Sequence, residues 1–131
     1  MNRPFGPFQI TDDPAAVDFE KVVALLKPTY WAGDRPSELI AKSIQHSICI
    51  SVFFENEQVG FARVVTDRAS FAWIADVIVD ERFQGRGLGK EIMRFIQDHP
   101  EVPASRQLLR TKDAHGLYEQ FGFTRQECMM K

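Results

Sequence analysis

Apolar residues first recur at helical spacing near the start of the chain. The positions of this stripe are Phe19, Val22, Val23 and Leu26. Their spacing predicts a helix with one face in the core, beginning near residues 12–14, where two aspartates precede a proline, and stopping at Pro28. A second helix is predicted after Pro36, with Ser37 near its cap. Its inward positions are Leu39, Ile40 and Ile44.

The pattern then changes to a period of two, which predicts strands. Residues 48–52 alternate between apolar and small polar side chains, and a polar turn at 55–57 leads to a second run at 59–65. These two runs predict a β-hairpin. Residues 71–79 are apolar on both faces, as in a central strand covered on both sides, with Asp76 as the exception. A short edge strand is also predicted at residues 8–11.

The remaining segments predict helices that alternate with strands. A helical stripe follows residue 87 and ends near the breaker at residues 98–100. Residues 107–111 predict a short strand, Asp113 predicts the cap of a helix through Phe121, and residues 123–129 predict a last strand. This element order predicts a mixed sheet with helices on both of its faces.

Composition narrows the class of protein. The chain has 131 residues, which fits one domain spanning residues 1–131, and a formal net charge of −2 argues against nucleic-acid binding. Cys49 and Cys128 are expected to be free thiols, and neither a signal peptide nor a long apolar run is present. We therefore expect a cytoplasmic protein without a membrane partner. His46 and Cys49 have no nearby ligand pair, so no metal is expected.

The most informative stretch is the glycine-dense turn within residues 80–92. Gly85, Gly87 and Gly89 lack a Cβ, so successive backbone N–H groups can converge on a phosphate at the positive end of a helix. Three residues separate Gly85 from Gly89, and Glu91 follows Lys90, so the spacing is wrong for a P-loop. The glycines also miss the register of the dinucleotide-binding motif. The pattern predicts a different phosphate-bearing ligand.

The turn resembles the acetyl-CoA signature of the GCN5-related N-acetyltransferases (GNAT), which here consists of Gln84, Gly87 and Gly89. Residues 114–123 are similar to a later helix of that family, and together the resemblance extends from about Phe8 to Met129. It implies a mixed α/β (α+β) fold, the acyl-CoA N-acyltransferase fold. Its mostly antiparallel sheet has six to seven strands in that family.

The resemblance also implies where acetyl-CoA is bound as co-substrate. Its diphosphate is expected on the backbone amides of Gln84, Gly85, Arg86, Gly87, Leu88, Gly89 and Lys90. Its pantetheine arm is expected to pair with the preceding strand at Val77, Ile78 and Val79. Thr111 stands where family members often have an asparagine, so the shorter side chain must either replace an amide contact to the cofactor or leave that contact unmade.

Two residues are candidates for the chemistry. Tyr118 matches the family tyrosine that protonates the leaving sulfur, with a core-packing tyrosine as the alternative. Asp76 is the candidate general base, because a carboxylate inside an apolar strand has to be paired, hydrated or used. Its alternative is a structural role, with water then removing the proton. A backbone N–H near Val77 is the implied donor to the oxyanion.

The implied function is direct transfer of an acetyl group to a primary amine of a small molecule, without an acyl-enzyme. By analogy with the family, Tyr30 and Trp31 line the acceptor site, with Asp34 available to attract an ammonium group; the alternative is a loop anchored by Trp31. A protein lysine or N-terminal acetyltransferase and a non-catalytic acyl-CoA sensor remain open. A homodimer is a further expectation from the family.

Overall fold

The computed structural model describes residues 1–131, and its strands form one sheet of six strands in the order of the sequence. Every neighbouring pair is antiparallel except the last, which is parallel. The strands are β1 (Asn2–Phe5), β2 (Phe8–Thr11), β3 (Ile48–Phe54), β4 (Glu57–Thr66), β5 (Ala72–Val79) and β6 (Gln107–Leu108). The predicted mixed, mostly antiparallel α/β fold is confirmed.

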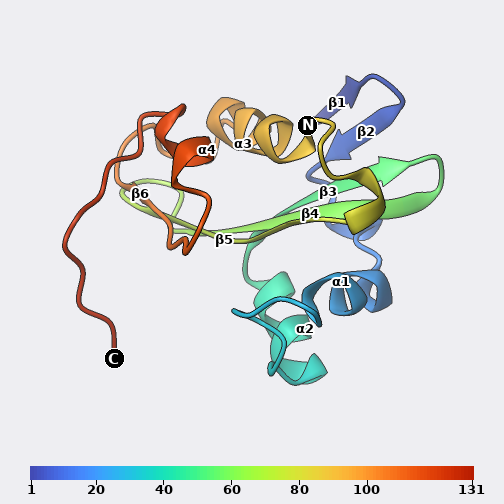
Figure 1. Ribbon diagram of the computed structural model, residues 1–131, viewed down its shortest axis with the longest axis horizontal. Helices are drawn as coiled ribbons and strands as arrows, with labels where there is room; N and C mark the ends of the chain where they lie inside the picture. Colours follow the sequence, from blue (N-terminus) through green and yellow to red (C-terminus); the bar gives the residue numbers. More distant parts are fainter.

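Helices cover both faces of this sheet (Figure 1). The helices α1 (Phe19–Leu26) and α2 (Ser37–Gln45) lie on one face, and α3 (Leu88–Asp98) and α4 (His115–Glu119) lie on the other. The larger core lies under α3, where Ile92, Phe95 and Ile96 pack against inward side chains of the strands. A smaller core under α1 and α2 contains Val22 and Phe61. Successive side chains of β3 and β4 point to opposite faces of the sheet, so that each strand contributes residues to both cores.

The leader forms a strand that the sequence pattern did not predict. β1 pairs with β2 through a tight turn at Gly6, whose φ of +55° is a conformation that glycine adopts readily. Pro4 lies within β1, and this is tolerated because β1 is an edge strand.

The first helix begins later than expected. Asp13 caps only a single 3-10 turn, Pro14–Ala16, and the backbone extends again at Val17. Asp18 is the true cap of α1, because its carboxylate accepts a hydrogen bond from the Lys21 N–H. The helix ends at Leu26, just before the proline. In α2 the prediction for Leu39 was wrong, since that residue is 52% exposed whereas Ile40 is buried.

The end of the chain differs most from expectation. The α4 helix is shorter than predicted, and the Thr111 hydroxyl, rather than Asp113, accepts a hydrogen bond at its start, from the Ala114 N–H. Residues 123–129 form no strand. Phe123 packs on the Tyr118 ring, but the residues after it are exposed, so no apolar face fixes the segment against the sheet.

None of the helices combines the length and the apolar character that crossing a membrane requires.

Candidate acetyl-CoA site

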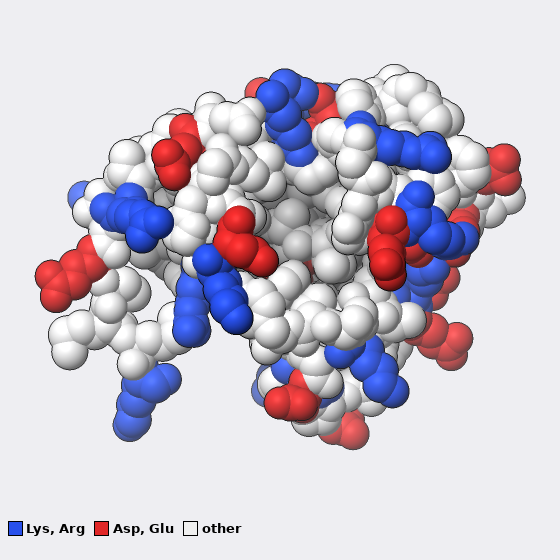
Figure 2. Space-filling model, in the orientation of Figure 1, with Lys and Arg blue, Asp and Glu red and all other residues white.

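A large cavity lies where the sheet opens. β5 and β6 pair only at Ala72–Gln107 and Trp73–Leu108, and beyond these pairs the two segments separate. The resulting cavity has a volume of about 1200 Å³ and is bounded by β5, the glycine turn, residues 109–114 and α4. Figure 2, drawn in the orientation of Figure 1, shows a hollow near the centre of the molecule, with acidic and basic side chains around it. One cavity therefore joins the glycine turn to the edge of β5.

The glycine turn presents a row of unpaired donors to this cavity. Gly85 and Gly87 both have a φ of +80°, and Gly87 is the residue from which α3 begins. The first intrahelical bond runs from the Glu91 N–H to the Gly87 carbonyl. None of the backbone N–H groups from Gly85 to Lys90 donates a hydrogen bond within the protein. Donors left free at a helix N-terminus favour an anion.

The side chains of the turn have different surroundings. The backbone N–H of Gln84 donates to the Glu81 carbonyl, so the row of free backbone donors begins at Gly85, one residue later than predicted. The Gln84 side chain donates to the Val79 carbonyl at 3.1 Å and ties the turn to β5. Lys90 lines the cavity, whereas the Arg86 guanidinium lies over the Phe83 ring. Lys90 is therefore better placed than Arg86 to contact an anion.

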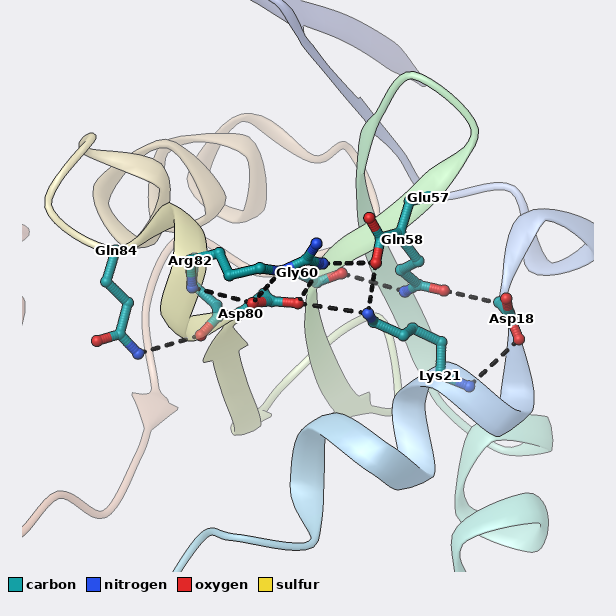
Figure 3. Close-up of polar contacts among 9 residues, drawn as sticks. Asp18, Lys21, Glu57, Gln58, Gly60, Asp80, Arg82 and Gln84 are labelled. Carbon is teal, nitrogen blue, oxygen red and sulfur yellow. Dashed lines mark hydrogen bonds and ion pairs between the residues drawn. The ribbon is translucent and has the colours of Figure 1, made fainter.

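An ion-pair network fixes the base of this turn (Figure 3). Asp80 caps the 3-10 turn Glu81–Phe83 by accepting from the Arg82 N–H, and the Arg82 side chain reaches the same carboxylate at 2.9 Å. Lys21 of α1 contacts both Asp80 and Glu57, at 3.3 and 2.8 Å. Hydrogen bonds from Arg82 lower the pKa of Asp80 below its usual range. The network connects α1 and the start of β4 to the segment that carries the glycines.

Replacing the cap should loosen the turn. We predict that Asp80→Ala lowers the free energy of unfolding by about 1 kcal/mol and weakens CoA binding severalfold, because the lost cap frees the 3-10 turn before Gly85. Calorimetric titration with CoA measures the second effect. Glu57→Gln is the matched control, since it removes an exposed partner of the same network and leaves the cap. Equal CoA affinity in the two variants would contradict a positioning role for Asp80.

The edge of β5 that faces the cavity is free from Ile74 to Val79, because β4 pairs only with the other edge. An irregularity interrupts this strand: the register shifts between Phe61 and Arg63 of β4, and Asp76 has a φ of +56°. Such a bulge turns the backbone locally. Val77, Ile78 and Val79 all line the cavity, so their free backbone groups can pair with an extended ligand, apart from the Val79 carbonyl.

Asp76 is bound by three side chains. Its carboxylate accepts from Arg35 at 2.8 Å, from Arg63 at 3.0 Å and from the Trp31 indole at 3.2 Å. Burial by itself would raise the pKa of Asp76, but the hydrogen bond from Arg35 and the charge of Arg63 outweigh it and lower the pKa. A charged carboxylate with both oxygens engaged is a weak base. This geometry favours the structural alternative for Asp76.

The structural role and the general-base role of Asp76 predict different results for the Asp76→Asn variant. Asp76→Asn should lower the free energy of unfolding by about 3 kcal/mol or more, because it leaves two partly buried guanidinium groups without an anion. The folded-state pKa is lowered, so this contribution is complete above about pH 4 and disappears as the pH falls through the folded-state value. Urea unfolding at neutral and acidic pH measures both effects.

The control for this experiment is Glu101→Gln, which breaks an exposed ion pair with Arg68 and should cost less than about 1 kcal/mol. A general base would give another result for Asp76→Asn, namely normal stability with a loss of kcat of about a hundredfold or more.

Tyr118 stands at the wall of the cavity, near the C-terminal end of α4. Its ring packs edge-on against Phe123, with the centroids 6.1 Å apart, and its hydroxyl has no hydrogen-bond partner in the protein. Burial, with the further influence of Tyr30 and Asp113, raises the pKa of Tyr118 above its usual value. The phenol is therefore protonated throughout the neutral range and has a free proton to donate.

The loop between α1 and α2 closes the other end of the cavity. Trp31 and Arg35 of this loop line the cavity and reach Asp76, and the Tyr30 hydroxyl accepts from the Lys112 N–H at 3.1 Å. Tyr30 and Trp31 pack edge-on with their centroids 5.1 Å apart. The loop is thus anchored and also forms an aromatic wall. Thr111 lines the cavity as well, but Asp34 does not.

Neither cysteine lines the cavity, and no metal-binding group is found. Cys49 is buried in the smaller core, and burial raises the pKa of its thiol to about 11. Cys128 is exposed near the end of the chain. The structure contains no group of three His, Cys, Asp or Glu side chains arranged to hold a metal ion.

Some residues of the site were not foreseen from the sequence. Arg63 lies on β4 with apolar residues on both sides, and no local pattern identifies Asp76 as its partner. Lys112 and Asp113 line the cavity through the separation of β6 from β5. The sequence signals for the residues around Asp76 were its own anomalous charge and the aromatic loop residues Tyr30 and Trp31.

Comparison with known proteins identifies relatives of the chain. Residues 45–125 match the family model of the acetyltransferase (GNAT) domain. A crystal structure of a protein from Xanthomonas campestris, described as an acetyltransferase of the GNAT family, is 38% identical. The alignment covers 94% of this chain and 87% of that chain, with a TM-score of 0.88.

Curated relatives are more distant. A Gibberella zeae protein named as an acetyltransferase is 25% identical over 71% of this chain and 64% of its own length. The spermine/spermidine N(1)-acetyltransferase of Bacillus subtilis is 24% identical, over 87% of this chain and 84% of that protein. The chain thus spans less than two thirds of the Gibberella zeae relative. From the matched domain and the Xanthomonas campestris structure, the chain belongs to the GNAT family of acetyltransferases.

Proposed function

We propose that this protein transfers the acetyl group of acetyl-CoA directly to a primary amine of a small molecule. The observation that carries the proposal is the row of free N–H groups from Gly85 to Lys90, at the end of a cavity of about 1200 Å³. A cavity of this size has room for an extended cofactor arm and a small acceptor together. This supports a ternary complex.

The chain's own groups fit each part of the co-substrate. The free amides and Lys90 suit a diphosphate, and the free edge of β5 suits the peptide-like groups of the pantetheine arm. Thr111 is at the cavity wall, where its hydroxyl accepts the Ala114 N–H and keeps its own O–H for a ligand.

Acetyl-CoA supplies a thioester whose C–S bond breaks as the new C–N bond forms, so the amine loses a proton and the sulfur gains one. Tyr118 holds a proton for the sulfur, and its raised pKa keeps the phenol protonated at neutral pH. A backbone N–H at the bulge near Val77 is our candidate for stabilising the oxyanion. Asp76 is engaged by two arginines, so we assign removal of the amine proton to water.

Polyamines fall within this proposal, whereas a protein acceptor and a sensor compete with it. The Bacillus subtilis relative acts on spermine and spermidine, so a polyamine is one candidate acceptor. A protein lysine or N-terminus is the competing acceptor, but the Lys112 backbone N–H donates to the Tyr30 hydroxyl and so ties the loop between α1 and α2 to the segment before α4 at the cavity wall, which favours a small molecule. A sensor would bind acetyl-CoA without turning it over.

Release of free CoA thiol tests the proposal. The protein is incubated with acetyl-CoA and a panel of primary amines, and products are identified by mass spectrometry. We expect amine-dependent thiol release together with an acetylated amine. Tight acetyl-CoA binding with thiol release no faster than in the absence of protein would support the sensor instead.

A further inference from the structure

We propose that the acceptor carries an anionic group, a carboxylate or a phosphate, in addition to its amine, and that Arg35 binds this group. The inference rests on the proposed function and names the class of its acceptor. It starts from the charges at the end of the cavity that is closed by the loop between α1 and α2, where Arg35 approaches the bulge of β5.

The cluster around Asp76 has one positive charge in excess. A single carboxylate, 2% exposed, faces two guanidinium groups, those of Arg35 and Arg63. Because little water reaches this carboxylate, the cluster's field is screened less than that of a surface pair. The cluster therefore attracts an anion from the cavity and does not attract a second cation.

Arg35 is the member of the cluster that can reach such an anion. Its side chain is 25% exposed and lines the cavity, whereas Arg63 is 12% exposed and does not line it. One guanidinium nitrogen of Arg35 donates to Asp76, and its other nitrogens have no partner in the protein. A guanidinium with free donors is suited to the paired oxygens of a carboxylate or phosphate.

The rest of the lining supports the same assignment. Its only carboxylates are those of Asp76, which is neutralised, and Asp113, which has no ion-pair partner. Lys112 adds a cation, with its ammonium 5.3 Å from the centre of the Tyr30 ring. Asp113 can attract the one amino group that reacts, which attacks in its neutral form, but no second free carboxylate is present for the other charge of a polyamine.

A matched panel of acceptors tests the proposal. The probes are γ-aminobutyrate, aminopropyl phosphate, n-butylamine and putrescine, which share a short linear chain and differ in the group opposite the amine. We expect kcat/KM for an anionic amine to exceed that for n-butylamine and putrescine by about tenfold or more, as for a charge-assisted hydrogen-bonded pair. Comparing the two anionic probes tells whether carboxylate or phosphate is preferred.

Variants link this preference to Arg35. In Arg35→Met, the ratio of kcat/KM for the preferred anionic amine over n-butylamine should fall about tenfold, and Arg35→Lys should recover part of it. A merely structural role would lower both values by the same factor and leave the ratio unchanged. Arg68→Met is the control for the loss of one positive charge, since Arg68 pairs with Glu101 on an exposed surface outside the cavity.

The outcomes separate this inference from the proposed function. Acetylation of n-butylamine or putrescine as efficient as that of both anionic amines would overturn the inference and leave the acetyltransferase proposal in place. An unchanged ratio in Arg35→Met would remove Arg35 as the anion ligand. Absence of thiol release with every probe, despite acetyl-CoA binding, would reject both proposals.

Discussion

Gly87→Trp abolishes CoA binding if the glycine turn is the diphosphate site. Two effects act together. The φ of +80° at Gly87 costs any L-residue about 1–2 kcal/mol, and the indole adds bulk beside the free N–H groups of the turn. A Cβ at Gly87 would meet no close neighbour, since the nearest atom would be in the Phe5 ring at 3.8 Å. The backbone strain and the bulk of the indole therefore cause the expected loss, which calorimetric titration with CoA measures.

The matched control is Gly6→Trp, at another glycine with positive φ and open space around its Cβ position. It carries the same backbone strain in the β1–β2 turn and should retain CoA affinity. Circular dichroism and thermal unfolding of both variants report whether they fold. A folded Gly87→Trp protein that binds CoA as tightly as the wild type would reject this site.

Tyr118→Phe should lower kcat by about a hundredfold, the lower end of the range for loss of a general acid, with CoA affinity little changed. The substitution removes a hydroxyl that has no partner in the protein and leaves the ring packed on Phe123. Steady-state kinetics with CoA titration separates the two quantities. The raised pKa of Tyr118 also predicts that the wild type shows no loss of activity from this group until the pH exceeds about 10.

Phe123→Leu is the control for the packing role of Tyr118, because it disturbs the same ring contact and keeps the hydroxyl. We expect this variant to lose much less activity than Tyr118→Phe. Equal turnover of wild type and Tyr118→Phe would remove the general-acid role. An equal loss in both variants would assign Tyr118 to packing alone.

Local patterns were sufficient to predict the centre of this fold. The alternation in residues 48–52 and the apolar run around Asp76 correspond to β3 and β5, because each strand's two faces meet the two cores described above. The glycine turn was predictable for a similar reason. Positive φ at Gly85 and Gly87 is a local requirement that the residue type itself reveals.

Features that depend on distant partners were not predictable. Asp76 is held by Arg63 and Arg35, which lie 13 and 41 residues away in sequence, and no local pattern joins them. The missing strand at residues 123–129 has the same origin, since alternation alone does not provide a paired edge or a buried face. The later start of α1 reflects competition between two capping aspartates, Asp13 and Asp18, which only the folded chain resolves.

A crystal structure with bound CoA tests the central claim most directly. The account predicts diphosphate oxygens about 2.9 Å from backbone nitrogens between Gly85 and Lys90, with the pantetheine arm beside the free edge of β5. A diphosphate bound elsewhere on the protein, with these N–H groups facing only water, would contradict it.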